Sequence, residues 1–477
     1  MSQSLRPTPS LMHRVRRIHF VGIGGAGMSG IAEVLANLGF EISGSDLAES
    51  ESTRRLRELG VRIHIGHAAE QLGSADVVVV SGAVPESNPE IEAARQRRVP
   101  VVPRAEMLGE LMRFRQGIAV AGTHGKTTTT SLVAEVLARS GLDPTFIVGG
   151  LVHAYGSHAR IGEGRYLVAE ADESDGSFLK LQPVISLITN IDRDHLDAYQ
   201  GSFDNLQRAF LEFLHHLPFF GVAVLCLDDP HVAELVPAVG RNVLTYGFSE
   251  AADVRATDLR QDGARMSFKL WLPDADQAVD VTLAQPGRHN VQNALGAAAV
   301  AWELGIEAER IVAGLAGFGG IGRRFERIGE LAFGAARVLA FEDYGHHPTE
   351  LDAVLRAARA GWPERRLLMV FQPHRYTRTR DQFDAFARVL SEVDALILAD
   401  LYPAGESPIP GIDSDALARA VRDRAELPIR RTGPVESVPD CLAELAEDGD
   451  LLLVMGAGDV GHLGEMLHRY RVPEAAS

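Results

Sequence analysis

Short apolar runs alternate along the chain with segments whose apolar residues recur at helical spacing. After residue 126, for example, Leu132, Val133, Val136 and Leu137 share one helical face, and Gly141 stands where a helix C-cap belongs. Alternation of this kind predicts α/β layers with largely parallel sheets. The runs that predict strands lie near residues 18–21, 40–43, 61–64, 77–81, 118–121, 166–169, 185–188, 337–341, 367–371, 395–399 and 451–455.

The chain of 477 residues is long enough for about three domains of ordinary size. The strand at 118–121 opens a second block, and the glycine-rich stretch at 319–322 is typical of a hinge before a third. We therefore predict domains at residues 1–117, 118–322 and 323–477.

Charge and cysteine usage narrow the class of protein. The chain has 47 Lys and Arg against 64 Asp and Glu, which gives a formal net charge of −17. This balance argues against a general nucleic-acid binder, because such a protein needs a basic face that displaces counterions. Two cysteines, Cys226 and Cys441, are too few for a disulfide framework, so we expect a reducing compartment.

The N-terminal region offers two interpretations. Arg14, Arg16 and Arg17 precede an uncharged run, as in a secretory signal peptide. Four glycines within residues 22–27 favour instead a strand, a tight turn and a helix. Because no run approaches the ~20 apolar residues of a membrane span, we expect a cytoplasmic protein without membrane insertion.

A first glycine loop follows the strand near 18–21. Gly22, Gly24 and Gly27 match G-x-G-x-x-G, and Asp46 lies at the end of the next strand. In such a loop, free N–H groups at a helix N-terminus face a pyrophosphate and the acidic residue holds a ribose hydroxyl. The motif does not distinguish nicotinamide, flavin or sugar nucleotides, and a tight turn without ligand is the plain alternative.

A second glycine loop, Gly122-Thr123-His124-Gly125-Lys126-Thr127, follows the strand at 118–121 and opens a helix. It has the composition of a phosphate-binding loop, in which main-chain N–H groups cradle phosphates, a lysine reaches the β and γ oxygens, and a threonine ligates Mg²⁺. The first glycine of the common pattern is missing, because Val120 occupies its place. The chain has only three lysines, Lys126, Lys180 and Lys269, so a lysine at this position is informative.

Acidic residues follow two later strands. Glu170, Asp172, Glu173 and Asp175 come after the run at 166–169, and Asp192, Asp194 and His195 come after the run at 185–188. A solvated loop is the plain alternative for each. Parallel strands gather their carboxyl ends at one sheet edge, so we predict a site there for Mg²⁺ and a nucleotide.

At this point the sequence resembles the Mur ligases, which add amino acids to the peptidoglycan precursor. The resemblance covers residues 15–470 or so. The motifs that carry it are Gly-Thr-His-Gly-Lys-Thr-Thr-Thr at 122–129, Glu-Ala-Asp-Glu-Ser-Asp at 170–175, Thr-Asn-Ile at 189–191, Asp-His-Leu-Asp at 194–197, Gly-Arg-His-Asn-Val-Gln-Asn-Ala at 287–294, Gly-Arg-Arg-Phe-Glu at 322–326, Asp-Tyr-Gly-His-His-Pro-Thr-Glu at 343–350 and Phe-Gln-Pro-His-Arg-Tyr-Thr-Arg-Thr-Arg at 371–380.

The resemblance implies a fold of three α/β domains: a Rossmann-like N-terminal domain that binds a UDP-sugar, a central P-loop ATPase-type domain with a mostly parallel sheet, and a Rossmann-like C-terminal domain that closes over ATP and the amino acid. It implies an ATP- and Mg²⁺-dependent ligase that joins L-alanine to the lactyl carboxylate of UDP-N-acetylmuramate through an acyl phosphate. A ligase that attaches a recycled tripeptide to the same sugar nucleotide is the alternative within the family.

The resemblance also implies site residues. ATP would contact Gly122, Thr123, His124, Gly125, Lys126, Thr127 and Thr128, with His289, Asn290, Asn293 and Arg324. Mg²⁺ would bind Thr127, Glu170 and His195. The UDP-sugar would contact Gly24, Gly25, Gly27, Asp46, His67 and Ser81. L-Alanine and the phosphates would meet Tyr344, His346, His374, Arg375 and Arg378.

Within that implied site, the residues that we expect to be catalytic are Lys126, His195, His346, His374, Arg375 and Arg378. The base that takes the proton of the amine stays open among His346, His374 and Asp343. Several Mur ligases bridge two metals with a carbamylated lysine. Here the one lysine between Lys126 and Lys269 is Lys180 in a strand-like setting, so we expect no such bridge.

Two other classes of protein are disfavoured. A nicotinamide-dependent oxidoreductase would use the first glycine loop but leave the second loop and the acidic strand ends unexplained. A guanine-nucleotide switch generally carries Asn-Lys-x-Asp, and no lysine of this chain stands in that context.

Overall fold

The computed structural model describes residues 12 and 14–472. These residues divide into two compact units. The first lies within Met1–Thr257, Lys269–Val281 and Gln292–Gly319, and the second within Asp258–Phe268, Thr282–Val291 and Gly320–Ser477. In this part of the chain no helix is both long and apolar enough to cross a membrane.

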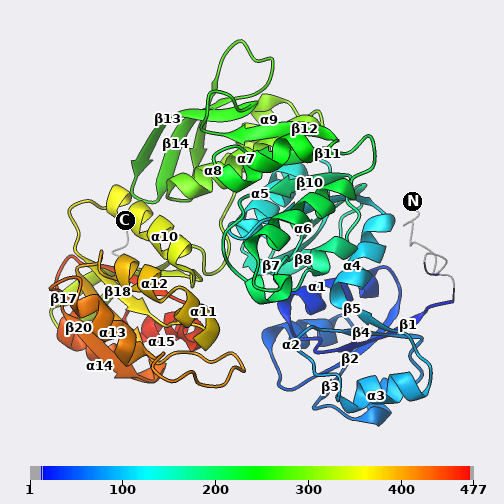
Figure 1. The fold of residues 1–477 in the computed structure, drawn as a ribbon, viewed down its shortest axis with the longest axis horizontal. Coiled ribbons are helices and arrows are strands. Elements are labelled where there is room, and N and C mark those ends of the chain that lie inside the picture. The colour runs from blue at the N-terminus through cyan, green and yellow to red at the C-terminus, as the bar shows by residue number, and fades with distance from the viewer. Residues whose placement is uncertain (1–11, 13, 473–477) are drawn as a thin grey trace. The chain divides into compact units, whose positions relative to one another are not determined.

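The N-terminal sheet has the strand order β3-β2-β1-β4-β5, and all of its pairings are parallel (blue in Figure 1). Alternate residues of β1 and β4 enter different cores: Phe20 and Val79 pack in one, Val21 and Val78 in the other. Helices therefore cover both faces, as expected for a doubly wound sheet. The elements are β1 (Arg17–Val21), α1 (Ala26–Asn37), β2 (Glu41–Asp46), α2 (Glu51–Glu58), β3 (Arg62–Ile65), β4 (Val77–Val80), α3 (Pro89–Gln96), β5 (Val101–Pro103) and α4 (Arg104–Arg113).

Local sequence explains where two of these helices begin. Ser50 accepts a hydrogen bond from Thr53 N, and the Thr53 hydroxyl accepts one from Ser50 N, which is a capping box for α2. Asn88 caps α3 and is followed by Pro89 at the first helical position.

The central sheet has ten strands in the order β15-β14-β13-β12-β11-β10-β6-β9-β7-β8. The pairings from β12 through β11, β10, β6 and β9 to β7 are parallel, and β8 adds an antiparallel edge. Its strands are β6 (Gln116–Ala121), β7 (Thr145–Val152), β8 (Ser157–Arg160), β9 (Tyr166–Glu170), β10 (Ile185–Ile188), β11 (Val222–Cys226), β12 (Asn242–Gly247), β13 (Val254–Asp262), β14 (Arg265–Trp271) and β15 (Val279–Leu283). The helices between them are α5 (Lys126–Arg139), α6 (Phe203–His215), α7 (Pro230–Leu235), α8 (Arg288–Glu303) and α9 (Ala308–Ala316).

One continuous core joins the N-terminal and central sheets. Helix α1 packs on β7 and β8 as well as on its own sheet, and Ile31 belongs to the same buried cluster as Ile147 and Phe210. At Gly30 a Cβ would lie 3.1 Å from the Ala159 Cβ, so the small residue permits this close approach. Most of the first two predicted blocks therefore lies in one compact unit, whereas residues 258–268, 282–291 and 320–322 of the second block belong to the other unit.

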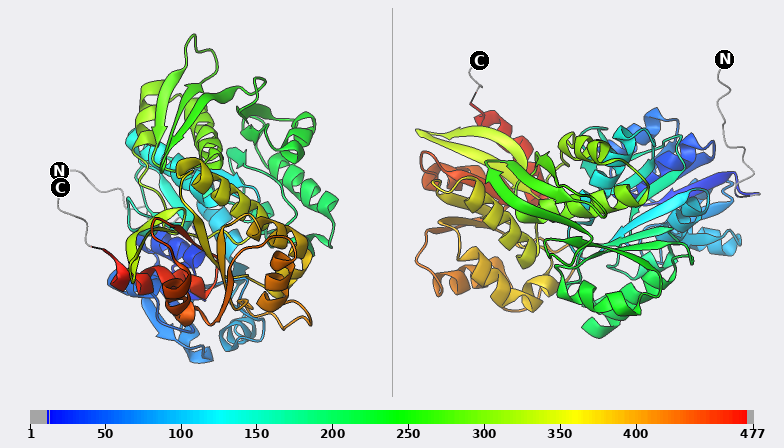
Figure 2. Two further views of the ribbon diagram at one scale, coloured as in Figure 1. Left: turned by 90° about the vertical axis from the view of Figure 1, so that its left-hand side faces the viewer. Right: turned by 90° about the horizontal axis from the view of Figure 1, so that it is seen from above.

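The C-terminal sheet has the order β16-β17-β21-β18-β19-β20 and is parallel except for the β16–β17 hairpin (yellow to red in Figures 1 and 2). Met369 and Phe371 of β18 enter a core with α10, α12 and α13, whereas Leu368 and Val370 enter a second core with α14 and α15. The strands are β16 (Glu326–Phe333), β17 (Ala336–Asp343), β18 (Leu367–Phe371), β19 (Ala395–Ala399), β20 (Ile429–Gly433) and β21 (Leu451–Met455). The helices are α10 (Pro348–Gly361), α11 (Tyr376–Asp381), α12 (Phe383–Leu390), α13 (Ser414–Arg422), α14 (Val438–Leu445) and α15 (Leu463–Leu467).

The predicted α/β class and mostly parallel sheets are confirmed, and so is the strand–turn–helix at the first glycine loop. Cys226 and Cys441 form no disulfide. One local expectation is wrong: Lys180 ends a short 3-10 helix (Ser177–Lys180) and is exposed, because Gly176 before it turns the chain with a positive φ.

Candidate active site

The end of β2 fastens the first glycine loop. The carbonyl of Ser45 accepts hydrogen bonds from Gly22 N at 2.9 Å and Ile23 N at 3.0 Å. The carboxylate of Asp46 accepts from Gly24 N at 2.7 Å and from Leu47 N at 2.8 Å. The Asp46 side chain therefore holds the main chain of the loop, a role that the spacing of the motif alone did not predict.

The other predicted UDP-sugar residues lie close to this loop. Ser81 follows β4, and a Cβ on Gly22 would lie 3.4 Å from the Ser81 Cβ. His67 follows β3, and its Nδ1 lies 2.9 Å from the Ser45 hydroxyl oxygen. The predicted set is thus assembled at the carboxyl ends of β1, β2, β3 and β4, where an open parallel sheet binds ligands.

Glycine is required at two positions of the second loop. Gly122 has φ +130°, and a Cβ there would lie 2.0 Å from the Thr189 hydroxyl oxygen. Gly125 has φ +80°, and a Cβ would lie 2.6 Å from Asn293 Oδ1. The loop can therefore lie directly against the end of β10 and against α8 only because both residues lack side chains.

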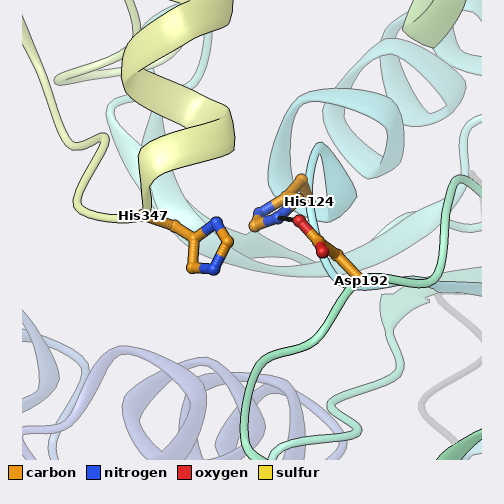
Figure 3. Close-up of side chains that lie close together, drawn as sticks. All are labelled: His124, Asp192 and His347. Carbon is orange, nitrogen blue, oxygen red and sulfur yellow. Dashed lines mark hydrogen bonds and ion pairs between the residues drawn. The ribbon is translucent and has the colours of Figure 1, made fainter. Parts of the chain in front are cut away.

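The segment after β10 holds the second loop by hydrogen bonds. Asn190 accepts from His124 N at 2.8 Å and donates its Nδ2 to His124 O at 2.9 Å. Its carbonyl accepts from Thr123 N at 3.0 Å. Asp192 N donates to the Thr123 hydroxyl, and the Asp192 carboxylate lies 3.0 Å from His124 Nε2 (Figure 3). The second glycine loop and the segment after β10, more than sixty residues apart in sequence, are thus joined by one set of hydrogen bonds.

Lys126, the first residue of α5, is turned back onto its own loop. Its Nζ donates to Gly122 O at 2.7 Å, to Thr123 O at 3.0 Å and to the Glu173 carboxylate at 2.7 and 3.0 Å. Burial raises the pKa of Glu173 to about 7, opposed by the charge of Lys126. Sequence reasoning placed Glu173 in an acidic run but did not single it out as the partner of the loop lysine.

The three predicted Mg²⁺ ligands lie at the ends of neighbouring elements. Thr127 is in the first turn of α5, Glu170 ends β9 and His195 precedes a 3-10 helix (Leu196–Tyr199) with φ +55°. Glu170 accepts from Gly149 N at 2.9 Å, and His195 Nε2 lies 3.4 Å from Asp194. The hydroxyl of Thr127 and the carboxylate of Glu170 are oxygen donors that suit Mg²⁺ completed by phosphate and water oxygens, whereas the imidazole of His195 is a less usual ligand for this ion.

Arg104 links the acidic segment to the first glycine loop, a contact for which there is no local signal in the sequence. Its guanidinium donates to Asp172 at 3.2 Å, and a Cβ on Gly27 would lie 2.6 Å from its Nη1. This cation therefore lies between the loop predicted to hold the UDP-sugar and the segment predicted to hold Mg²⁺.

In the second unit, the predicted aromatic and basic residues form one cluster. Rings of Tyr344 and His346 have centroids 5.3 Å apart, and those of His346 and His374 are 5.6 Å apart. Arg324 lies over the Tyr344 ring at 5.2 Å, and Arg378 Nη1 is 3.4 Å from His374 Nδ1. Burial lowers the pKa of His346 to about 3, so its imidazole is neutral at pH 7.

Tyr402 completes this cluster and was missed, because nothing in its local sequence points to a site. Its ring stacks on His374 with centroids 5.4 Å apart and an interplanar angle of 12°. Its carbonyl accepts from Arg375 N at 2.8 Å, which supports the positive φ of 69° at Arg375. The side chain of Arg375 is exposed, whereas Arg378 is buried.

The predicted adenine-side residues lie on the first two turns of α8. Asn290 donates to Pro286 O at 2.8 Å, and Asn293 Oδ1 accepts from the Thr129 hydroxyl at 3.2 Å. Burial, helped by Arg324, lowers the pKa of His289 to about 4.

Three family models match consecutive parts of the chain. The Mur ligase family catalytic domain matches residues 17–116, the Mur ligase middle domain matches residues 120–301, and the domain described as Mur ligase, glutamate ligase domain matches residues 323–458. The chain belongs to the Mur ligase family. The sequence-based assignment to this family of ligases is thereby confirmed.

Close relatives of this Mur ligase share nearly its full length. The UDP-N-acetylmuramate–L-alanine ligase of Xylella fastidiosa (strain M23) is 58% identical over 98% of each chain. The enzyme of the same name from Xanthomonas campestris pv. campestris (strain B100) is 57% identical, also over 98% of each chain.

Solved structures match the whole fold. The UDP-N-acetylmuramate-alanine ligase of Thermotoga maritima has a TM-score of 0.80 at 27% identity and covers 95% of this chain and 98% of its own. A murein peptide ligase of Psychrobacter arcticus has a TM-score of 0.72 at 26% identity, with coverages of 97% and 100%. These likenesses confirm the predicted three-domain α/β architecture of a Mur ligase.

Proposed function

We propose that this Mur ligase joins L-alanine to the lactyl carboxylate of UDP-N-acetylmuramate, with ATP converted to ADP and phosphate. The observation that carries the proposal is the 57–58% identity, over 98% of both chains, to ligases named for this reaction. The murein peptide ligase likeness, at 26% identity, gives less support to the tripeptide alternative.

A carboxylate is a poor electrophile, and ATP is used to activate it. In the proposed reaction a lactyl carboxylate oxygen attacks the γ-phosphorus and ADP leaves, which gives an acyl phosphate. The amine of L-alanine then attacks the acyl carbon, and phosphate leaves with the original carboxylate oxygen. Stabilising charge on the transferred phosphoryl group is the main aid that proteins give such a step.

Lys126 is the residue placed to give that aid. Its ammonium group already lies in the loop, held by two loop carbonyls and by Glu173. We propose that phosphate oxygens replace the Glu173 carboxylate as its partners, since both are anionic acceptors. The N–H groups of Thr127 and Thr128, at the start of α5, would contact the same phosphates.

Thr127, Glu170 and His195 would hold Mg²⁺, with the threonine hydroxyl and the glutamate carboxylate as the oxygen donors that this ion prefers. Bound there, the ion supplies positive charge that offsets the charge of the phosphates. Gly149 allows Glu170 this position, because a Cβ on Gly149 would lie 2.8 Å from Glu170 Oε2.

The hydrogen bonds of the candidate bases favour a histidine over Asp343 as the group that would face the amine. Both oxygens of Asp343 accept main-chain hydrogen bonds, from Gly345 N at 2.7 Å and Phe325 N at 2.8 Å. His346 Nδ1 lies 3.1 Å from Tyr344 O, a group that only accepts, so Nδ1 carries the hydrogen. The Nε2 atom of neutral His346 is then the acceptor that we propose for the amine N–H. We also propose that the reaction takes place in the cytoplasm.

Phosphate release tests the proposal. The protein is mixed with ATP, Mg²⁺ and UDP-N-acetylmuramate, and either L-alanine or L-Ala-γ-D-Glu-meso-diaminopimelate is added. We expect release with L-alanine and little with the tripeptide. Release with the tripeptide alone would transfer the assignment to the peptide-recycling activity, and silence with both would overturn the substrate assignment.

A further inference from the structure

A buried polar network lies beneath the first glycine loop. Glu90, near the start of α3, and His19, on β1, are fully buried. The Glu90 carboxylate accepts hydrogen bonds from the Ser45 hydroxyl at 2.6 Å, from His19 Nε2 at 3.1 Å and from Ala68 N at 3.2 Å. The hydrogen bonds from His19 and Ser45 lower the pKa of Glu90 against the effect of burial, so the group is an ionised acceptor at pH 7.

The ionised carboxylate fixes the direction of the hydrogen bonds around it. Because Glu90 can only accept, the single hydrogen of the Ser45 hydroxyl is committed to Glu90. The contact of 2.9 Å between Ser45 Oγ and His67 Nδ1 then requires that His67 donate. A neutral His67 therefore carries its hydrogen on Nδ1 and presents Nε2 as an acceptor.

The same strand end orients the glycine loop. Ser45 uses its carbonyl for Gly22 and Ile23, and its hydroxyl for Glu90 and His67. Asp46 uses its side chain for Gly24 and its carbonyl for Gly66 N at 2.8 Å, next to His67. The position of His67 relative to the loop is thus set through two adjacent residues of β2.

His67 Nδ1 also lies 3.5 Å from the other Glu90 carboxylate oxygen, so Glu90 faces this nitrogen directly as well as through Ser45. We propose that Glu90 is a positioning residue for the sugar-nucleotide site and, through Ser45 and this direct contact, holds His67 with Nε2 as the acceptor for an N–H or O–H group of the UDP-sugar. This inference rests on the proposed function, because it takes the UDP-sugar as the ligand of the first glycine loop. An acceptor at Nε2 suits an imide N–H or a hydroxyl of the ligand and does not suit a phosphate oxygen, which needs a donor.

The hydrogen position on His67 can be observed without ligand. In protein labelled with ¹⁵N-histidine at pH 8, the signal that disappears in His67→Gln belongs to His67. We expect the Nδ1–H form in the wild type. In Glu90→Gln the new amide can donate to Ser45, which releases the Ser45 hydrogen for His67 Nδ1, so the Nε2–H form should appear. An Nε2–H form in the wild type would overturn the proposal.

Binding of UDP-N-acetylmuramate, measured by calorimetry, gives the second readout. Glu90→Gln should raise the Kd for UDP-N-acetylmuramate about three- to tenfold, which is the effect of one lost hydrogen bond. In turnover it should raise the KM for the same substrate and leave kcat unchanged. The matched control is Glu33→Gln, another buried carboxylate of the same domain, which pairs with Arg55 at 3.0 Å. This control should leave the Kd unchanged.

Misfolding of the variant, failure of the proposed function and failure of the positioning role give different results. ATP binding at the second loop reports whether Glu90→Gln is folded. If it is not, Ser45→Ala removes the shorter of the two links between Glu90 and His67 and should also weaken UDP-N-acetylmuramate binding, although by less, because the direct contact of 3.5 Å remains. Failure of the wild type to bind UDP-N-acetylmuramate would overturn the proposed function. Wild-type binding that Glu90→Gln and Ser45→Ala leave unchanged would overturn the positioning role alone.

Discussion

Single residues of the nucleotide loop were predictable from sequence, but their partners were not. Lys126 stands out because it is one of three lysines and follows a glycine-rich turn. Its partner Glu173 lies 47 residues away, among other acids that look alike in sequence. Tyr402 and Arg104 carry no local signal at all, because stacking and ion pairing across the fold depend on tertiary packing.

Gly122→Ala tests the close approach of the loop to Thr189. Because the Cβ would lie 2.0 Å from the Thr189 hydroxyl at φ +130°, we expect loss of measurable ATP binding in calorimetry. The matched control is Gly141→Ala. Gly141 also has a positive φ, of +82°, but a Cβ there would have no atom within 4 Å apart from its chain neighbours. Both should lose about 1 kcal/mol or more of stability from backbone strain, and equal ATP binding by the two variants would refute the steric argument.

Glu173→Gln tests the competition between carboxylate and phosphate for Lys126. Removing the negative charge leaves the buried ammonium without its ionic partner, so we expect ATP to bind several-fold more tightly and the ATP-free protein to be less stable. The exposed Asp175 of the same segment provides the control Asp175→Asn, which should change neither. Unchanged or weaker ATP binding in Glu173→Gln would show that the carboxylate does not occupy the place of a phosphate oxygen.

At the scale of elements, the apolar runs predicted most of the buried strands but missed the buried strand β11 as well as several edge strands. The runs Leu367–Phe371, Ala395–Ala399 and Leu451–Met455 are wholly buried, so they are apolar throughout and easy to identify. Edge strands such as β8 (SHAR) and β20 (IRRTG) are partly exposed and carry polar residues, so composition does not mark them.

Asn190→Ala tests how the end of β10 holds the loop. The change removes two hydrogen bonds to the main chain of His124, each worth about 1 kcal/mol net. We expect the Kd for ATP to rise about tenfold or more. Asn205→Ala, near the start of α6, removes the hydrogen bonds of this side chain with Tyr199 O and Arg208 Nη1 and should leave ATP affinity unchanged. A Kd for ATP that does not rise in Asn190→Ala would contradict a role for this segment in shaping the loop.

At the scale of the whole molecule, the stability of the fold should depend on pH through the partly buried His289. In the folded protein the pKa of His289 is lowered from 6.5 to about 4. Between these two pH values the unfolded chain binds a proton at His289 and the folded chain does not. The stabilising contribution is therefore complete above pH 6.5 and is lost as the pH falls toward 4.

This contribution can be measured by urea unfolding. Between pH 7 and pH 5 we expect the wild type to lose roughly 2 kcal/mol through His289 alone, at about 1.4 kcal/mol per pH unit below 6.5. His289→Gln should lose correspondingly less over the same interval. Identical pH dependence in the two proteins would show that His289 is not held neutral by burial.

The central claim is that ATP activates the lactyl carboxylate in a Mur ligase with this nucleotide loop, and oxygen transfer tests it most directly. UDP-N-acetylmuramate labelled with ¹⁸O in that carboxylate is turned over with ATP, Mg²⁺ and L-alanine, and the phosphate is analysed by mass spectrometry. The account predicts one ¹⁸O in each phosphate released, because the attacking oxygen leaves with phosphorus. Unlabelled phosphate formed together with the amide product would contradict it.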